Sequence, residues 1–145
     1  PDAALDDTPG KLWPQQLARV SQGGGDLGDR LTKGLEDSPR GPVLFIGADA
    51  PDLTPTLLWR AFNALKRHDA VFGPSTDGGF WLFGLNKHAR TAPPFSTVRW
   101  SGPQAMEDVR ANLPDGVRTA LLPTLIDIDE AQDWANWRRS ISPQE

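Results

Sequence analysis

Short apolar runs that alternate with amphipathic segments constrain the fold of this chain more than any other feature. The apolar runs predict short strands at residues 43–46, 70–72, 80–85 and 119–122. Helical spacing of apolar residues predicts helices at residues 26–36, 54–68, 103–113 and 130–139. This alternation is typical of an α/β sandwich with a mostly parallel sheet. We therefore expect residues 1–145 to form a single α/β domain that begins with an irregular stretch.

The composition excludes several classes of function. The chain has a net charge of −4, whereas a nucleic-acid-binding surface is basic, so we expect no nucleic-acid partner. It contains no cysteine and 2 histidines, and any bound metal should therefore be a hard cation held by oxygen atoms. No apolar run is long enough for a membrane span and no secretory signal is visible, which predicts a cytoplasmic protein.

The segment FIGADAPDLTP places an acid directly after an apolar strand. Asp49 comes three residues after the last strand residue, Ile46, and Pro51 fixes the turn. Open α/β sheets bind their ligands at the carboxyl ends of strands, so Asp49 is a candidate functional acid. The alternative is a loop that only leads into the next helix, with Thr54 as N-cap and Pro55 as the first helical residue.

The glycine-rich segment QGGGDLG, residues 22–28, has more than one interpretation. Its spacing matches G-x-G-x-x-G, but no convincing strand precedes it, which makes a dinucleotide-binding fingerprint improbable. The segment is then either a loop that caps the helix beginning at Asp26 or a cradle of backbone N–H groups for an anion. The sequence leaves these two interpretations equally open.

Asp127 and Asp129 form an acidic pair close to the end of the chain. Such a pair resembles the Asp-x-Asp of haloacid-dehalogenase phosphatases, but those enzymes carry it on an early strand with a long fold after it. We expect Asp129 to cap the final helix. A cation held by Asp129, with Asp127 nearby, is compatible with that position.

The segment GPSTDGG has a structural and a functional interpretation. Asp77 and Gly78 favour a tight hairpin turn, and alone this interpretation is preferred. Two successive glycines beside an acid, Gly78 and Gly79, also allow a backbone to approach a ligand closely. Of the aromatic residues that follow, Phe80 and Trp81, one is expected to face a cleft.

Arg99 and Trp100 are a weaker signal. A cation next to an indole suits a phosphate contact and a stacked ring, but such a pair is more often a surface anchor.

Five sequence blocks occur in a fixed order: QGGGDLGDRL, PVLFIGADAPDLTPTLL, DAVFGPSTDGGFWLFGL, VRWS and IDIDEAQDW. In these blocks the chain resembles the bacterial DUF2064 proteins, which are glycosyltransferase-A-like. These look like relatives of 2-phospho-L-lactate guanylyltransferase and the molybdenum-cofactor nucleotidylyltransferases. The resemblance covers nearly all of residues 20–135. It implies a nucleotide-diphospho-sugar transferase fold (GT-A, Rossmann-like), a three-layer sandwich with a mostly parallel sheet.

The resemblance also implies functional residues. A Mg²⁺ or Mn²⁺ would be held by Asp49 and Asp129, with Asp127 as the less certain partner. Asp77 would be the catalytic residue in a loop on the acceptor side. The implied nucleotide- or substrate-binding residues are Gln22, Gly24, Gly25, Asp26, Gly78, Gly79 and Trp100.

The chain departs from the family pattern in two places. Ala50 stands where the family usually has a cysteine, at a position that is not an obvious ligand. The family also opens with a strand and a Gly/Arg/Lys-rich loop that holds nucleotide phosphates, and this chain starts after both. We therefore expect an N-terminally incomplete domain that lacks its first strands.

Three functions follow from these features. The first is a metal-dependent glycosyl transfer from a nucleotide sugar to an unknown acceptor, in which Asp77 orients or deprotonates the acceptor hydroxyl. The second is a nucleotidyltransferase that uses a nucleoside triphosphate and releases pyrophosphate. The third is a non-catalytic or truncated domain that binds nucleotide or assembles through an exposed sheet edge as a homodimer.

Overall fold

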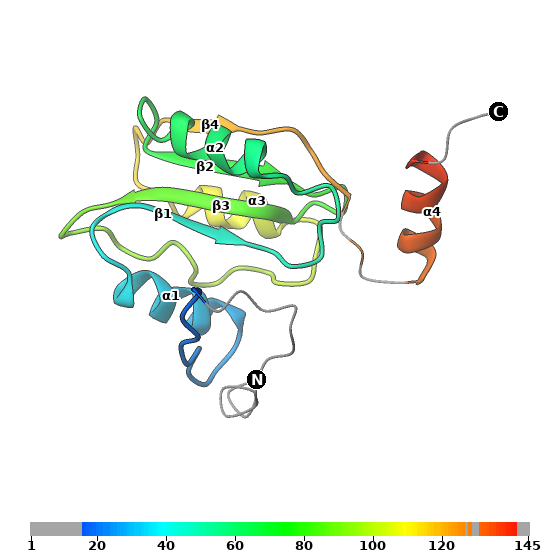
Figure 1. Ribbon diagram of the computed structural model, residues 1–145. Coiled ribbons are helices and arrows are strands. Elements are labelled where there is room, and N and C mark those ends of the chain that lie inside the picture. The colour runs from blue at the N-terminus through cyan, green and yellow to red at the C-terminus, as the bar shows by residue number, and fades with distance from the viewer. Residues whose placement is uncertain (1–15, 127, 129–130, 142–145) are drawn as a thin grey trace.

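The structure is a computed structural model, and it describes residues 16–126, 128 and 131–141 (Figure 1). Every predicted strand and helix is present, with ends that differ by a few residues. No helix within the described ranges is long and apolar enough to cross a membrane. In chain order the elements are α1 (Leu27–Asp37), β1 (Gly41–Ile46), α2 (Pro55–Ala64), β2 (Ala70–Pro74), β3 (Phe80–Lys87), α3 (Ala105–Ala111), β4 (Thr119–Leu121) and α4 (Ala131–Ile141).

The four strands form one sheet in the order β1-β3-β2-β4. β3 is antiparallel to both of its neighbours, and β2 is parallel to β4. Three strands therefore run in one direction and β3 runs against them. The sheet is mixed, and the expectation of a mostly parallel sheet is not confirmed. The reason is the connection between β2 and β3, which is a hairpin rather than a helical crossover.

Helices cover both faces of the sheet and make three layers (Figure 1). On one face α1 and α3 pack against β2 and β3, with Leu35, Phe83 and Val109 buried between them. On the other face α2 packs through Ala61 against the fully buried Val71. β2 and β3 are buried along most of their length because apolar side chains from both layers cover them.

The helices begin where their capping residues predict. Asp26 is the N-cap of α1, and it exchanges side-chain-to-backbone hydrogen bonds with Asp29 in a capping box. Thr54 caps α2 by accepting a hydrogen bond from the backbone N–H of Leu57. The other end of α1 is held from the sheet, because Lys87 Nζ donates to backbone carbonyls at that end, including that of Glu36 at 2.7 Å.

Candidate active site

Asp49 lies at the carboxyl end of β1, as predicted. The strand is still paired at Gly47, whose N–H donates to the Trp81 carbonyl at 2.9 Å. On the other side of Asp49, the buried Ala50 begins a turn, which the Leu53 N–H closes by donating to the Ala50 carbonyl at 3.1 Å. The exposed Asp49 side chain is therefore placed by a fixed backbone on both sides.

Gly47 leaves room for the Asp49 carboxylate. A Cβ atom on Gly47 would lie 2.6 Å from Asp49 Oδ1, far inside van der Waals contact. A glycine is therefore needed for the carboxylate to occupy this position beside the strand end.

The Asp77 loop ends β2 at the same edge of the sheet, because β1 and β2 run in the same direction. The loop is a hairpin turn, in which Gly79 N–H donates to Asp77 Oδ1 at 2.8 Å. Gly78 has a positive φ of 93°, and a Cβ there would lie 2.2 Å from the Pro103 carbonyl oxygen. The hairpin interpretation is confirmed, and the close approach that Gly78 permits is to the protein's own backbone, whereas Gly79 lines the pocket described below.

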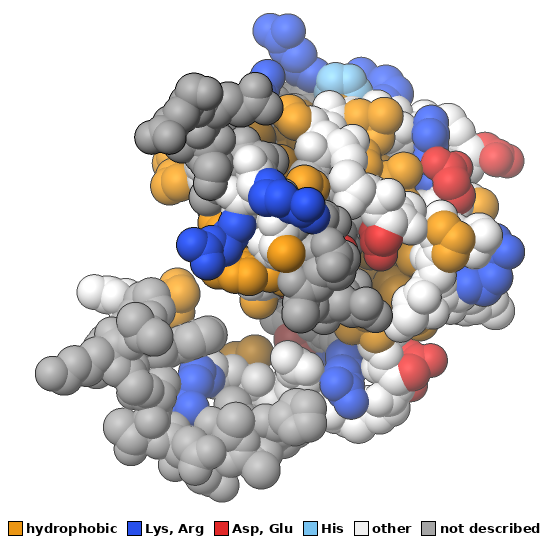
Figure 2. Space-filling model, turned by 90° about the vertical axis from the view of Figure 1, so that its right-hand side faces the viewer, with side chains coloured by type: hydrophobic (Ala, Val, Ile, Leu, Met, Phe, Trp, Pro, Cys, Tyr) orange, Lys and Arg blue, Asp and Glu red, His pale blue; other side chains and the backbone are white. Residues whose placement is uncertain are grey.

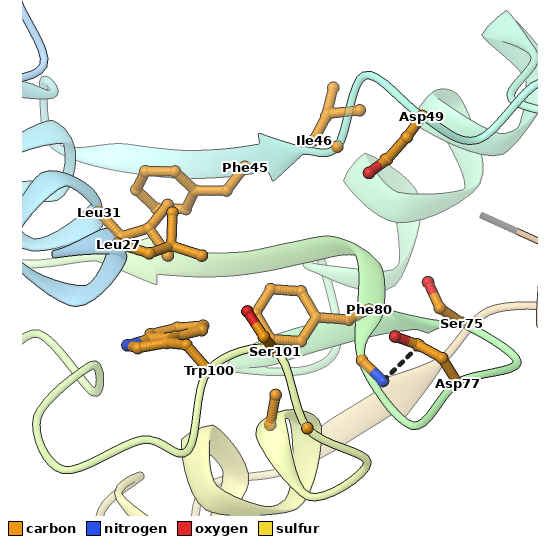
Figure 3. Close-up of a pocket in the computed structure, with 14 residues that line it drawn as sticks. Leu27, Leu31, Phe45, Ile46, Asp49, Ser75, Asp77, Phe80, Trp100 and Ser101 are labelled. Carbon is orange, nitrogen blue, oxygen red and sulfur yellow. Dashed lines mark hydrogen bonds between the residues drawn. The ribbon is translucent and has the colours of Figure 1, made fainter. Parts of the chain in front are cut away.

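Ser75 is a functional candidate that the sequence analysis missed. The residue is 5% exposed, and its buried Oγ has no hydrogen-bond partner among the described residues. Figure 3 shows this oxygen pointing towards the side of the pocket on which Asp49 lies. Buried hydroxyls are normally satisfied, so an orphan one beside a cavity indicates a place for a ligand or a water molecule. Its only signal in the sequence is its position directly after an apolar strand.

Asp49, Ser75 and Asp77 open into one pocket of about 380 Å³ (Figure 3). Figure 3 shows the two acids and Ser75 at one end of it, apolar side chains at the other, and Ser101 between the two ends, beside Phe80. Phe80 lines the pocket while Trp81 is buried in the opposite layer, which confirms that one of the two aromatic residues faces the cleft. The lining residues are Leu27, Leu31, Phe45, Ile46, Gly47, Asp49, Ser75, Asp77, Gly79, Phe80, Trp100, Ser101, Gly102 and Ala105.

The loop that carries Trp100 is held by an ion pair. The guanidinium of Arg99 donates to both carboxylate oxygens of Asp108, at 2.8 and 2.6 Å, and the Arg99 backbone N–H adds a third hydrogen bond. These bonds lower the pKa of Asp108 to about 2, the side-chain bond from Arg99 contributing most. Arg99 therefore anchors this loop, which is the role that the sequence analysis considered more common for such a pair. The neighbouring Trp100 faces the pocket.

The glycine-rich segment leads into α1, and of its residues 22–28 only Leu27 lines this pocket. Gly25 has a positive φ of 88°, and the backbone N–H groups of Asp26 and Asp29 are bonded to each other's carboxylates. This geometry is that of the capping loop. The predicted ligand-binding residues Gln22, Gly24, Gly25 and Asp26 are therefore not brought together with Asp49 and Asp77.

The late acidic block reaches the site through one described residue. Ile128 N–H donates to the Asp49 carbonyl at 3.0 Å. The predicted metal ligands Asp127 and Asp129 themselves lie outside the described residues. Within the described ranges, no group of three or more acidic or histidine side chains is arranged to hold a metal ion.

Figure 2 views the molecule from the right-hand side of Figure 1, the side towards which β1 runs. Among the residues drawn in colour, acidic side chains stand beside apolar ones, and Lys and Arg side chains are dispersed in separate groups. The described part of this face is thus mixed in charge.

Sequence comparison assigns a family. Residues 2–102 match the family described as "Uncharacterized protein conserved in bacteria (DUF2064)". The chain belongs to this family. A search of curated proteins finds no match.

The fold is similar to that of a crystal structure from Desulfovibrio desulfuricans G20, which is named "putative nucleotide-diphospho-sugar transferase". The TM-score is 0.71 and the sequence identity is 29%. The match covers 86% of this chain and 55% of that chain, so this DUF2064 sequence spans little more than half of the larger protein.

Proposed function

We propose that this chain carries the residues that bind the donor and the acceptor in a glycosyl transfer from a nucleotide sugar to a hydroxyl group. The observation that carries the proposal is the pocket at the carboxyl ends of β1 and β2, into which Asp49 and Asp77 both open. Two carboxylates at the ends of parallel strands suit a ligand with separate donor and acceptor parts. The name of the similar structure from D. desulfuricans is consistent with this class of reaction.

A Mg²⁺ or Mn²⁺ fits the donor atoms at this edge. Carboxylate and hydroxyl oxygens are the ligands that these hard cations prefer, and Asp49 and Ser75 supply both. We propose Asp49 and Asp129 as ligands, with Asp127 as a further candidate; the hydrogen bond from Ile128 to Asp49 supports this grouping. When bound, the cation would offset the charge of the donor diphosphate.

Asp77 is placed to act on the acceptor. Its Oδ1 is held by the Gly79 N–H, which fixes the carboxylate and leaves Oδ2 for a ligand. In the proposed reaction Asp77 accepts the proton of the acceptor hydroxyl as the acceptor oxygen bonds to the anomeric carbon. The bond from that carbon to the phosphate oxygen breaks, and its electron pair leaves with the nucleoside diphosphate.

The test is Asp49→Asn in the full chain, assayed with Mn²⁺ and a panel of UDP-, GDP-, dTDP- and ADP-hexoses. We expect release of nucleoside diphosphate to fall by about 100-fold, the scale found when one charge-stabilising group is removed. Asp52→Asn is the matched control, because Asp52 is exposed in the same loop but does not line the pocket. Equal rates for Asp49→Asn and the wild type would refute the assignment.

The same assay separates the alternative reactions. Pyrophosphate released from a nucleoside triphosphate would identify a nucleotidyltransferase instead. Absence of both products and of nucleotide binding would favour the non-catalytic interpretation.

A further inference from the structure

The pocket has an apolar end that the chemistry at Asp49 and Asp77 does not use. Leu27 and Leu31 of α1, Phe45 of β1, Phe80 of β3 and Trp100 surround it. Figure 3 shows the other four side chains grouped together, on the far side of Phe80 from Ser75 and the two acids.

The apolar end is built into the core and does not depend on a ligand for its shape. The rings of Phe80 and Trp100 are 6.4 Å apart, and both belong to a chain of ring contacts that includes Phe95 and Phe45. Arg99 fixes the loop that carries Trp100. The rings therefore form a rigid concave surface of the kind found in small-molecule sites.

The donor is a poor occupant for this surface. A sugar, a diphosphate or the edge of a base would lose most of its water there, and the one side-chain hydroxyl beside this end of the described pocket is that of Ser101. The leucine and phenylalanine side chains offer no hydrogen bond, and Trp100 Nε1 lies beside Gly28, at 3.1 Å from where a Cβ of that glycine would be. The occupant should therefore be an apolar group whose polar atom reaches Ser75 and Asp77.

We propose that the apolar end binds the body of the acceptor, and that the acceptor is an alcohol carried on an apolar ring or similarly compact hydrocarbon. The inference rests on the proposed glycosyl transfer and names its acceptor class. The apolar end adjoins a second groove, which shares Leu27, Leu31, Phe45 and Ile46 with the pocket, and the pocket's volume of about 380 Å³ is enough for a ring-bearing alcohol. Its hydroxyl would be directed to Asp77, and the unpaired Ser75 Oγ would give or accept a hydrogen bond there.

Benzyl alcohol is the probe, and the Trp100 indole N–H signal in a ¹H–¹⁵N spectrum of the full chain is the readout. Trp100→Phe serves to assign that signal. We expect saturable shifts with a dissociation constant of roughly 1 mM, the range for a ligand of this size. Glycerol, which carries three hydroxyl groups but lacks the apolar body, should leave the signal unchanged.

Two matched variants test the location. Leu27→Asn should weaken benzyl alcohol binding at least about threefold, since it places an amide in the apolar wall. Leu27 is 49% exposed, so the substitution should not unfold the chain. Leu121→Asn, at an exposed leucine of β4 outside the pocket, should bind as the wild type does. Equal weakening by both variants, or shifts of equal size with glycerol, would overturn the inference.

The outcomes of the binding and turnover experiments separate this inference from the proposed function. Benzyl alcohol binding with the predicted variant pattern supports the apolar site whether or not donor turnover is found. Donor turnover without such binding overturns the inference alone. Competition by uridine or guanosine for the same Trp100 shift would assign the apolar end to the nucleotide base and overturn it too. In a protein that turns over its donor, benzyl glycoside should form; its absence would overturn the acceptor role.

Discussion

At the scale of single residues, Gly47 sets the position of Asp49 without supporting the core. A Cβ on Gly47 would meet only the free end of the Asp49 side chain closely, and that end can move into solvent. We expect Gly47→Ala to lower Mn²⁺ affinity about tenfold in calorimetric titration, the usual effect of displacing a ligand through its neighbour. The midpoint of urea unfolding should stay close to that of the wild type.

Gly73→Ala is the contrasting control for that prediction. A Cβ on Gly73 would lie 2.3 Å from Cε2 of Trp81, which is 1% exposed and has nowhere to move. This variant should lose about 1–3 kcal/mol of unfolding free energy through overpacking. Unchanged Mn²⁺ affinity in Gly47→Ala would show that the glycine does not position the acid.

Asp108 makes the stability of the pocket wall depend on pH. Its folded pKa, about 2, is below the ordinary value of 3.8 for an aspartate, so the stabilisation is fully present above about pH 4. It is lost as the pH falls towards 2, because the protonated acid no longer pairs with Arg99. We expect Asp108→Asn to be less stable than the wild type at pH 7 and this difference to shrink below pH 3.

Urea titrations of both proteins at several pH values measure that difference directly, since other titrating groups contribute equally to each. A difference between wild type and Asp108→Asn that stays constant from pH 7 to pH 2.5 would show that the pair with Arg99 does not stabilise the fold.

At the scale of elements, α1 depends on the sheet for its far end. Lys87 of β3 donates hydrogen bonds to backbone carbonyls in the last turn of α1. The last turn of α1 has no basic side chain of its own that could do so. We expect Lys87→Met to lower the unfolding free energy by about 1–2 kcal/mol, as for a hydrogen-bonded charge. Because α1 carries Leu27 and Leu31, benzyl alcohol should also bind more weakly.

Lys66→Met is the matched control for Lys87. Among the residues that the structure describes, Lys66 Nζ bonds only to the side chain of Asn63, on an exposed surface. Its removal should change the urea midpoint little. Equal losses in the two variants would contradict a special role for Lys87 at the end of α1.

The elements themselves could be predicted because local signals fixed each of them. Asp26 and Thr54 marked helix starts, and apolar runs marked the strands. The direction of β3 was not recovered, because strand pairing depends on partners far along the chain. The Asp77-Gly78 turn carried the information that β2 and β3 form a hairpin, but the α/β alternation outweighed it in the prediction.

At the scale of the whole molecule, the sheet has an open edge at β1. The hydrogen bond from Gly47 to Trp81 fixes the alternation along this antiparallel pair, so the peptide groups of Leu44 and Ile46 face away from β3. No strand of the described residues pairs with this edge. Pro42 also falls in the outward set, where a missing N–H disrupts no pairing.

We expect copies of this chain to associate by antiparallel pairing of their β1 strands. Ile46 is 45% exposed, and Ile46→Lys would place a charge on this apolar edge, which opposes pairing between copies. Sedimentation velocity should show a dimer that this variant weakens about tenfold. Leu121→Lys, on the opposite edge strand β4, is the control and should leave the dimer intact. A wild-type chain that is monomeric at all concentrations would exclude this association.

The site was predictable in part, again for physical reasons. Asp49, Asp77 and Trp100, which line the pocket, stood out in the sequence because strand ends, glycines and aromatic residues leave a local pattern. The apolar wall and Ser75 were not, because a leucine that lines a cavity and a leucine in the core look alike in sequence. Only the crossing of α1 over β1 and the loop at Trp100 brings them together.

The hydrogen bond from Ile128 to the Asp49 carbonyl ties two segments that are far apart in the chain. An amide proton held in this way exchanges with deuterated solvent only when the bond opens. The exchange rate of this single proton therefore reports how often the peptide of the candidate acid is released from its partner. Any ion or nucleotide that steadies Asp49 should slow this exchange, so the exchange rate reports whether the site at the carboxyl end of β1 is occupied.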